Sequence, residues 1–442
     1  MNSHGNPLAD ALAARGARTV HMAVPDVDGG LRERRLPLAS LAEALAAGAA
    51  FCNVLHEWDV TDTVHGPGPF VGEGLDLSAN AVRGYPFEPD SAWVLADFTG
   101  PHRATSPRVL LETQLEKAAR LGLVPRAAFE FEWLVFDEDA KSVRGKGWSG
   151  LDAFAPDNRC WDAQSAAINA EVVAELQSTL EAADIGVFGL GMELGAGCLE
   201  ATLRATDGLR AADDAALFKL ATRAFFRRRG QTACFMAQSD ANAPGLSGHL
   251  HLSLEDSNGR NLFRAEPGTL STTARHFVAG VLALLPELAA LPLHTVNAYR
   301  RLSPGNWAPR TTTWSFGGYT TAIRAVSGEH AQARLEFRIP GADVNPWLGL
   351  AMFLGAGLHG IEQQLEPPAP VTGDGRTHTA PDLKALPHDL WTAAAALEAS
   401  QAARELFGAR FIEAFVASRR HEFNSLRRAV SAQERARYFE IA

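Results

Sequence analysis

The stretch Ala127–Phe136, which reads AAFEFEWLVF, decides how this chain folds. Side chains alternate between the two faces of a strand, so Glu130 and Glu132 share one face and the aromatic residues occupy the other. Two carboxylates about 7 Å apart on a core strand are costly unless a cation lies beside them. The alternative is an edge strand with a solvated acidic face, and the apolar flanks weigh against it. Both interpretations stay open on this segment alone.

A second segment, Gly248–Leu254, repeats the alternation with different chemistry. His249, His251 and Ser253 fall on one face, and leucines fall on the other. An HxH pair is common in metal sites but also arises by chance. The segment therefore favours a metal-binding strand without requiring one.

A third segment, Arg334–Pro340, has the same design. Its polar positions are Arg334, Glu336 and Arg338, and its other positions are apolar. Taken alone, the pattern is best interpreted as a ladder of surface ion pairs. Next to metal-binding strands, the arginines would instead hold carboxylates or phosphates.

Another acidic pair, Glu193 and Glu200, frames a glycine-rich turn. The glycines allow the backbone to turn tightly, so the two carboxylates can converge. Ligands dominated by oxygen suit Mg²⁺ or Mn²⁺ rather than a structural zinc ion. The candidate ligands gathered in this way are one imidazole of the HxH pair and five carboxylates: Glu130, Glu132, Glu193, Glu200 and Glu336.

Bulk properties exclude several classes of protein. The chain has 442 residues and a formal net charge of −10, with no basic tract of the kind that nucleic-acid binding needs. Its four cysteines are far apart and lack a CxxC pair, which indicates neither a disulfide framework nor a zinc cluster. The most apolar stretch, 277–293, is interrupted by prolines and predicts a buried helix ended by proline, not a membrane span. With no secretory signal at the start, we expect a cytoplasmic protein.

Local patterns predict a small mixed N-terminal domain and a larger α+β domain, separated near the segment 99–102, which reads as a linker. Strands are expected at 19–24, 127–136, 247–254, 321–326 and 333–339. Helices are expected near 39–49, from Pro107, over 163–184 and 210–230, and from about Pro387 onwards.

Five segments in this order resemble the glutamine synthetase family over nearly the whole chain. They are FEFEWLVFD (129–137), GMELGAGCLE (191–200), GLSGHLHLSL (245–254), VNAYRRLSPGNWAP (296–309) and RLEFRIPGADVNPWLGL (334–350). Five ordered motifs are far more specific than any one of them. The resemblance implies an α+β fold, with an N-terminal β-grasp-like domain (1–103) followed by a glutamine synthetase-type catalytic domain (104–442). It also implies a homo-oligomer, with a ring such as a dodecamer as the expected form.

The resemblance also implies roles for individual residues. Two or more Mg²⁺ (or Mn²⁺) ions per subunit would be held, the first by Glu132, Glu193 and Glu200 and the second by Glu130, His249 and Glu336. ATP, as co-substrate, would be surrounded by His251, Ser253, Arg324 and Arg334. Arg301 and Arg338 would bind the carboxylates of glutamate, with Gly245 in the adjacent loop, and Arg301, Trp307 and Tyr319 would be the catalytic positions.

The chain departs from the family pattern at several of these positions. Trp307 stands where ammonia-using members carry a flap glutamate, and Tyr319 stands where many members carry an arginine. Pro244 replaces a usual asparagine, and Cys160-Trp161 aligns loosely with a tyrosine position of the ammonium pocket. An indole removes a negative charge aimed at ammonium and offers a ring to a larger, organic amine. Tyrosine can donate a hydrogen bond but supplies no positive charge.

These features favour an ATP-dependent ligase that joins glutamate to a polyamine or monoamine. In the family an N-terminal loop reaches the neighbouring subunit's site, and here its acids Glu57, Asp59 and Asp62 would attract a cationic amine; a solvated loop is the alternative. A glutamine synthetase that uses ammonia and a non-catalytic relative remain the competing hypotheses. The complete set of metal-ligand positions argues against the non-catalytic one.

Overall fold

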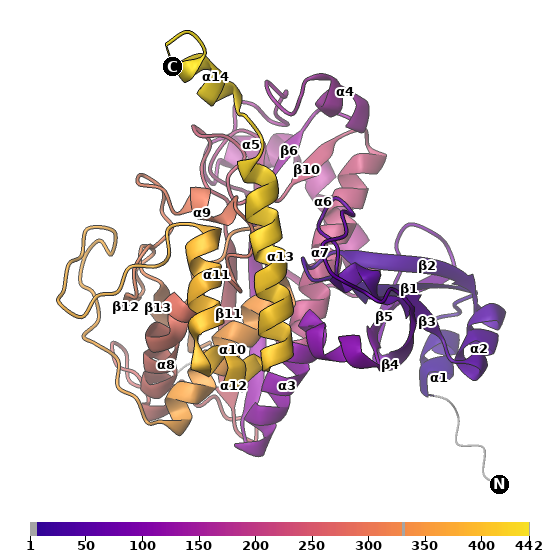
Figure 1. Cartoon of the computed structure of the whole chain (residues 1–442), viewed down its shortest axis with the longest axis horizontal. Helices are drawn as coiled ribbons and strands as arrows, with labels where there is room; N and C mark the ends of the chain where they lie inside the picture. The colour runs from indigo at the N-terminus through magenta and orange to yellow at the C-terminus, as the bar shows by residue number, and fades with distance from the viewer. Residues whose placement is uncertain (1–6, 329–331, 442) are drawn as a thin grey trace.

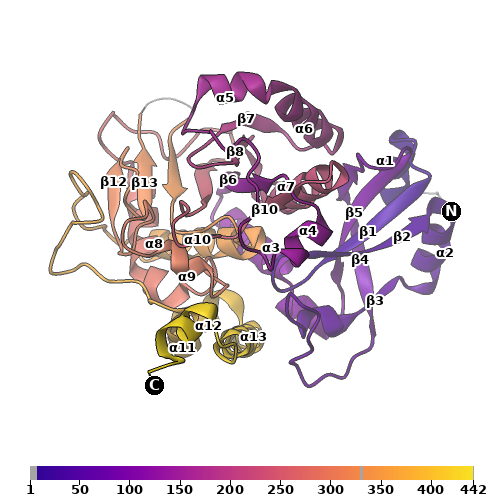
Figure 2. The same ribbon diagram turned by 90° about the horizontal axis from the view of Figure 1, so that it is seen from above.

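The computed structural model describes residues 7–328 and 332–441, and it shows a smaller N-terminal sheet unit beside a larger α+β unit (Figures 1 and 2). The N-terminal unit contains α1 (Pro7–Ala14), β1 (Thr19–Pro25), β2 (Leu31–Pro37), α2 (Leu38–Ala47), β3 (Ala50–Cys52), η1 (Asn53–His56), β4 (Gly72–Gly84), β5 (Ser91–Phe98) and η2 (Pro101–Thr105). The strands of the large unit are β6 (Val124–Phe136), β7 (Val187–Met192), β8 (Cys198–Leu203), β9 (Thr206–Asp207), β10 (Thr232–Cys234), β11 (Gly248–Glu255), β12 (Trp314–Phe316), β13 (Ile323–Val326) and β14 (Arg334–Phe337). Its helices are α3 (Pro107–Arg120), α4 (Ala140–Gly145), α5 (Ala163–Ile168), α6 (Ala170–Ala182), α7 (Gly208–Arg228), α8 (Thr272–Leu288), α9 (Ala298–Arg301), α10 (Pro346–Glu362), α11 (Leu390–Ala399), α12 (Gln401–Phe407), α13 (Ala409–Arg427) and α14 (Ala432–Tyr438).

The N-terminal sheet has the strand order β2-β1-β5-β4-β3. Its central pair, β1 and β5, is parallel, and the pairs β1–β2, β4–β5 and β3–β4 are antiparallel. Apolar side chains on one face of this sheet form two small clusters, one of them closed by α1 and α2. On the opposite face, Ala23, Trp93 and Leu95 belong to the main core of the chain. The unit combines helices with a sheet, as the expected mixed domain does. Its β-grasp-like character stays a prediction.

The large sheet carries the predicted strands as immediate neighbours, in the order β12-β13-β14-β11-β6-β8-β7. Its apolar face packs on helices: the Phe131 ring stacks on Phe218 of α7 with centroids 5.7 Å apart, and Phe337 stacks on Phe353 of α10 at 4.9 Å. The two-residue alternation read from the sequence therefore points aromatic residues into the core and leaves the polar positions on the opposite face. The expected α+β architecture is thus present.

Helices α8 and α10 pack closely beneath this sheet because two glycines lie at their contact. A Cβ on Gly360 would come within 2.1 Å of the His276 carbonyl oxygen, and a Cβ on Gly280 within 2.3 Å of the Ala356 carbonyl oxygen. The predicted buried helix is α8. It includes Pro286 and ends at Leu288, so Pro286 does not end it. None of the helices in the described part of the chain is long and apolar enough to cross a membrane.

The junction of the two units consists of a short connecting segment and of buried ionic contacts. The segment 99–102 was expected to be a linker, and it does connect β5 of the N-terminal sheet with η2, which leads to α3 of the large unit. It is anchored to the N-terminal unit, because His102 is buried and its ring nitrogens lie 2.7 Å from Glu73 and 3.2 Å from Glu57.

Arg108 lies at the centre of the same junction. Its guanidinium binds Asp97 of the N-terminal sheet at 2.7 Å and Asp213 of α7 at 2.9 Å, and all three side chains are buried. The Trp347 indole nitrogen also donates to Asp213, at 2.8 Å. One guanidinium thus neutralises two buried carboxylates that come from different units.

Replacing Arg108 with alanine is expected to lower the free energy of unfolding by about 3–5 kcal/mol, because two buried carboxylates lose their cation. Urea unfolding followed by tryptophan fluorescence measures the loss. Arg103→Ala is the matched control, since Arg103 pairs with Glu112 at 3.2 Å on the surface and such pairs contribute about 1 kcal/mol or less. Equal losses in the two variants would contradict this account of the junction.

Candidate active site

The polar face of the large sheet brings the predicted ligand positions into cross-strand register. His249 lies directly opposite Glu130 across β11 and β6, and His251 lies opposite Glu336 across β11 and β14. Glu132 lies opposite Glu200 across β6 and β8. Side chains directly opposite one another in an antiparallel pair are close neighbours, so strand pairing gathers these residues into one site.

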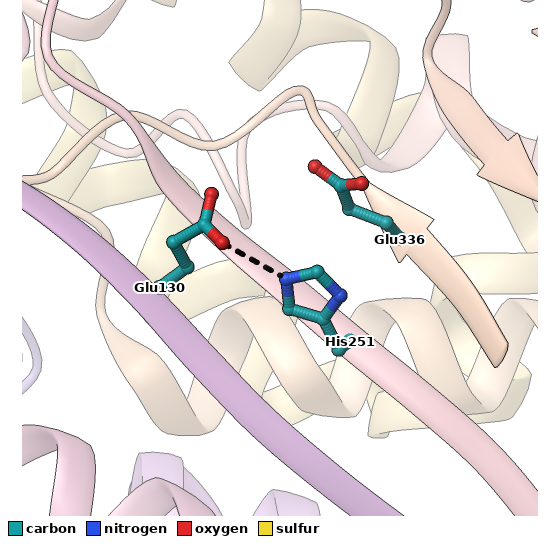
Figure 3. A group of neighbouring side chains, drawn as sticks. All are labelled: Glu130, His251 and Glu336. Carbon is teal, nitrogen blue, oxygen red and sulfur yellow. Dashed lines mark ion pairs between the residues drawn. The ribbon is translucent and has the colours of Figure 1, made fainter. Parts of the chain in front are cut away.

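Among the described residues, Glu130, His251 and Glu336 form a group that could hold a metal ion, with one ligand atom from each lying within 4.8 Å of the others (Figure 3). The Nε2 atom of His251 lies 3.5 Å from Glu130 Oε2. His249 faces the same carboxylates, because its Nδ1 lies 3.1 Å from Glu130 Oε1 and 3.3 Å from Glu336 Oε1. Both imidazoles thus border the group, and the assignment of His249 to the metal and of His251 to the nucleotide stays a prediction.

Arginines neutralise the buried end of this group. Glu336 is fully buried and forms ion pairs with both Arg324 and Arg338. Burial raises the pKa of Glu336 and the neighbouring histidine and arginine charges lower it, so the net result is a pKa below the ordinary value. The Glu336 carboxyl therefore carries its charge in the ligand-free protein.

Arg301 holds the other side of His249. Its Nη2 lies 3.3 Å from His249 Nε2, and its Nη1 donates to the carbonyl oxygen of Ile339 at 2.9 Å. Burial lowers the pKa of Arg301 to about 10 and that of His249 to about 4. An arginine donates to Nε2, so His249 is neutral with its proton on Nδ1, directed at the carboxylates.

The second carboxylate group lies on the other side of β6. Glu132 accepts a hydrogen bond from the Ser247 backbone N–H at 2.7 Å, and Glu193 accepts one from the Leu194 N–H at 2.8 Å. Burial raises the pKa of Glu132, and burial together with the charges of Glu130, Glu132 and Glu193 raises the pKa of Glu200 strongly. Repulsion between these carboxyl groups is what a bound cation would relieve.

Several contacts at this group were not predicted from the sequence. The Cys160 thiol donates to Glu193 Oε1 at 3.0 Å, and the Asn158 amide donates to the carbonyl oxygens of Glu193 and Gly195 at 2.6 and 2.9 Å. Thr202 donates to Glu130 at 3.2 Å. Trp161, next to Cys160, has 78% of its surface exposed and does not close the site within this subunit. Thr202 lies opposite Glu130 across β6 and β8, so the contact could have been predicted only from the register of these two strands.

The donor set fits divalent cations. It consists of carboxylate oxygens and imidazole nitrogens, its carboxyl pKa values are raised where the groups face one another, and thiolate ligands are absent from the predicted set. We propose that Glu132, Glu193 and Glu200 hold one ion and that Glu130, Glu336 and a histidine hold another.

Guanidinium groups continue along the same face towards the end of β11. The Nε of Arg334 donates to His251 Nδ1 at 3.2 Å, and Arg324 lies opposite Glu336 across β13 and β14. Ser253 is the next residue on the polar face of β11. Among the described residues, Arg301 Nε and Arg324 Nε are buried and have no hydrogen-bond partner. Free donors of this kind suit an anionic ligand.

The flap, the loop that carries Trp307, is tied to Arg301 of the site. The Asn306 amide donates to Gln238 Oε1 at 3.1 Å and to the Arg301 carbonyl oxygen at 2.9 Å. Gly245 packs against the same arginine, since a Cβ there would lie 2.8 Å from Arg301 Cγ. The indole itself is 57% exposed, so it lies at the rim of the site.

Tyr319 lies between two arginines of the site. Its ring centroid is 4.4 Å from Arg324 Cζ and 5.3 Å from Arg338 Cζ, and its carbonyl oxygen accepts from Arg338 Nε at 2.9 Å. Tyr319 therefore brings no charge but offers a π surface to two guanidinium groups. Pro244 contributes differently, by packing against the turn between Glu193 and Glu200, where a Cβ on Gly195 would lie 2.9 Å from its Cγ.

The acidic residues of the N-terminal loop are engaged within the subunit. Glu57 pairs with His102 at 3.2 Å, Asp59 with His421 of α13 at 3.0 Å, and Asp62 with Arg32 at 2.7 Å. The solvated loop that was the alternative expectation does not describe Asp59, which is buried. In this arrangement each of the three carboxylates already has a histidine or arginine partner within the chain.

A sheet face that gathers carboxylates, imidazoles and guanidinium groups is characteristic of metal-dependent enzymes that act on anionic substrates. Comparison with known proteins gives the family. Residues 104–438 match the catalytic domain of glutamine synthetase. The chain belongs to the glutamine synthetase family, and the prediction of a ligase of this type is confirmed.

Three relatives illustrate the similarity. A type-1 glutamine synthetase 2 from Dictyostelium discoideum is 33% identical over 96% of this chain and 84% of its own length. A glutamate–isopropylamine ligase from a Pseudomonas species is 31% identical over 98% of this chain and 97% of its own length. A solved structure titled apo GmaS without ligand superimposes with a TM-score of 0.86 at 26% identity, covering 98% of this chain and 99% of that one.

Binding of Mg²⁺ to the metal-free protein is expected to release protons. The pKa of Glu200 is raised above 4.5 in the folded chain, so this carboxyl keeps a proton at pH values where an ordinary glutamate has lost it. A cation favours the charged form, so the affinity should rise with pH above 4.5. Calorimetry in two buffers of different ionisation enthalpy measures the proton release.

The same raised pKa makes the metal-free fold less stable as the pH rises above 4.5, because the unfolded chain gives up the Glu200 proton first. Glu200→Gln should reduce both the proton release and this pH dependence. Proton release as large in Glu200→Gln as in the wild type would contradict the assignment.

Proposed function

We propose that this protein is an ATP-dependent ligase that joins the γ-carboxylate of glutamate to an organic amine, a monoamine or a polyamine, through γ-glutamyl phosphate. The observation that carries the proposal is the joint presence of two carboxylate groups for cations, the arginines beside them and an indole at the flap. Phosphorylation turns a poor leaving oxygen into a good one, which is why such a ligase consumes ATP.

Different side chains along the sheet face would bind the nucleotide and the glutamate. Arg324 and Arg334, near the end of β11, would bind the phosphates of ATP, and Ser253 would border the nucleotide. Arg301 and Arg338 would bind the carboxylates of glutamate. Their guanidinium groups lie beside His249, 3.3 Å from Nε2 and 3.5 Å from Nδ1 respectively. Mg²⁺ or Mn²⁺ supplies positive charge that neutralises the phosphate oxygens during transfer. The arginines fix the two anions in place and exclude other orientations.

An organic amine is supported by the flap and by the relatives. Trp307 stands where the resemblance places a glutamate, so a carboxylate that would enclose ammonium is replaced by a ring. The relatives include, besides the isopropylamine ligase, a γ-glutamylpolyamine synthetase from Streptomyces coelicolor at 30% identity. Both kinds of amine are thus represented among similar chains.

Use of ammonia is the second candidate, favoured by the similarity to the Dictyostelium glutamine synthetase. Phosphate release with ATP, Mg²⁺, glutamate and a panel of amines that includes ammonia tests both. A specificity constant for ammonia above that of every amine in the panel would overturn our proposal. Failure with every acceptor would favour a non-catalytic protein. The cytoplasmic location and the ring-shaped homo-oligomer stay predictions, and light scattering after size exclusion tests the latter.

Glu130→Ala and Glu132→Ala should each abolish ATP-dependent phosphate release, because each removes a carboxylate of one proposed cation group. The folds should survive, since both residues lie on the polar face of β6 and the aromatic face is unchanged. Circular dichroism and activity at saturating Mg²⁺ are the measurements. Full activity in both variants would refute the assignment of the metal ligands.

Trp307→Ala should lower kcat/KM for n-butylamine about tenfold while changing that for ammonia little. An alkyl group that buries about 60 Å² against the indole gains about 1.5 kcal/mol, and ammonia has no carbon to bury. Trp307→Glu should move the preference further towards ammonia. Trp148→Ala is the matched control, since this indole is 70% exposed and lies in another part of the sequence, beyond α4. Equal effects of Trp307→Ala on both acceptors would argue against an amine-facing indole.

A further inference from the structure

The flap indole already has a cation beside it. The Cζ atom of Arg376 lies 5.1 Å from the centroid of the Trp307 ring, which is a cation–π distance. Asp374 holds the same guanidinium: its two carboxylate oxygens lie 3.0 and 3.1 Å from Nε, and Oδ2 lies 2.8 Å from Nη2. The carboxylate therefore takes the Nε–Nη2 edge of the guanidinium and leaves the remaining surface of the group for the ring.

The loop that presents Arg376 is fixed to the core of the site. The Gly375 N–H donates to Thr320 Oγ1 at 2.8 Å, and the Val371 N–H donates to the Trp314 carbonyl oxygen at 2.8 Å. A Cβ on Gly375 would lie 2.5 Å from the Thr320 carbonyl oxygen, so the two backbones touch. Thr320 is the neighbour of Tyr319 in the sequence. The position of the Arg376 charge is thus set by the same segment that borders the substrate arginines.

We propose that Arg376, held over Trp307 by Asp374, is a specificity-determining residue that selects monoamines with a neutral organic substituent and disfavours diamines and polyamines. The inference rests on the proposed function, because it takes Trp307 to border the acceptor amine. It narrows the substrate from organic amines in general to those that carry a single positive charge.

When the first nitrogen of an acceptor amine reaches the reacting carboxyl group, its substituent extends towards the rim of the site, where Trp307 lies. If that substituent carries a second ammonium group, this charge meets the Arg376 guanidinium, which already packs on the Trp307 ring. A neutral alkyl or aryl substituent instead packs on the remaining indole surface without a charge penalty. Like charges a few ångströms apart at a partly exposed site reduce binding by about tenfold.

Carboxylates that could attract a second ammonium are already engaged within this chain. Asp374 is bound by Arg376 itself, through both its side chain and its backbone N–H at 2.9 Å. Glu57, Asp59 and Asp62 of the N-terminal loop pair with His102, His421 and Arg32. An incoming polyamine would have to break one of these pairs to gain a counter-charge.

Two acceptors of equal length separate charge from size: n-butylamine and 1,4-diaminobutane. The measured quantity is the ratio of their kcat/KM values, with ATP, Mg²⁺ and glutamate saturating, in the full-length protein. The wild type should favour n-butylamine by at least about tenfold. The ratio should fall about tenfold in Arg376→Gln and further in Arg376→Glu, following the charge at this position.

Arg260→Gln is the matched control. Arg260 binds Asp256 through the same pair of contacts, backbone N–H at 3.0 Å and Nε at 3.1 Å, and lies in an exposed turn after β11. The ratio of kcat/KM for n-butylamine to that for 1,4-diaminobutane should be the same in Arg260→Gln as in the wild type. As a test that needs no variant, raising the ionic strength should lower the wild-type ratio, since salt screens the repulsion.

Different failures have different meanings. A wild type that prefers the diamine, or a ratio that does not change across the Arg376 series, overturns the role of Arg376 while leaving an amine ligase in place. A wild type that uses ammonia and neither organic amine overturns the proposed function, and the inference falls with it.

Discussion

Carboxylates that share one buried sheet face impose the constraint on which the rest of this structure depends. Glu130, Glu132, Glu200 and Glu336 project from adjacent strands, and Glu193 joins them from the turn between β7 and β8. Like charges in such a place raise one another's pKa or require cations. The chain treats these carboxylates in two different ways. Glu336 is paired with arginines of the chain, whereas Glu132 and Glu200 are not.

At Glu336 the countercharge is built in. Arg324 and Arg338 pair with it, and its pKa stays below the ordinary value. At Glu132 the chain supplies a backbone N–H donor from Ser247. Neither Glu132 nor Glu200 has an arginine ion pair among the described residues, and both pKa values are raised. The end of the site at Glu336 is therefore preorganised for anions without any ion, whereas the end at Glu132 and Glu200 is complete only with a cation. Such a division suits a reaction that brings two anions, a nucleotide and a carboxylate, to one sheet face.

The sequence predicted the strands of this face well because a two-residue alternation of charged and aromatic residues fits a half-buried strand and does not fit the period of a helix. It could not predict the register, and the register decides that Glu130 faces His249 and that His251 faces Glu336. Strands β7 and β8 were not predicted, since Gly189 and Gly191 weaken the strand pattern of β7. Helix α10 was not predicted for the opposite reason: it is buried nearly all round, so its apolar run has no helical period. Arg376 lies in a loop without a motif, and only the folded chain brings it to Trp307.

Two departures from the family pattern have the same physical form. Where the resemblance places a flap glutamate the chain has Trp307, and where it places an arginine the chain has Tyr319, so one negative and one positive charge are each exchanged for a ring. Each ring is faced by guanidinium: Arg376 at Trp307, and Arg324 with Arg338 at Tyr319. A ring accepts a cation on its face but does not neutralise it. At both positions the guanidinium charge is already paired with a carboxylate, Asp374 for Arg376 and Glu336 for Arg324 and Arg338. The two rings therefore add a packing surface but no counter-charge, and such a surface suits an amine whose substituent is neutral.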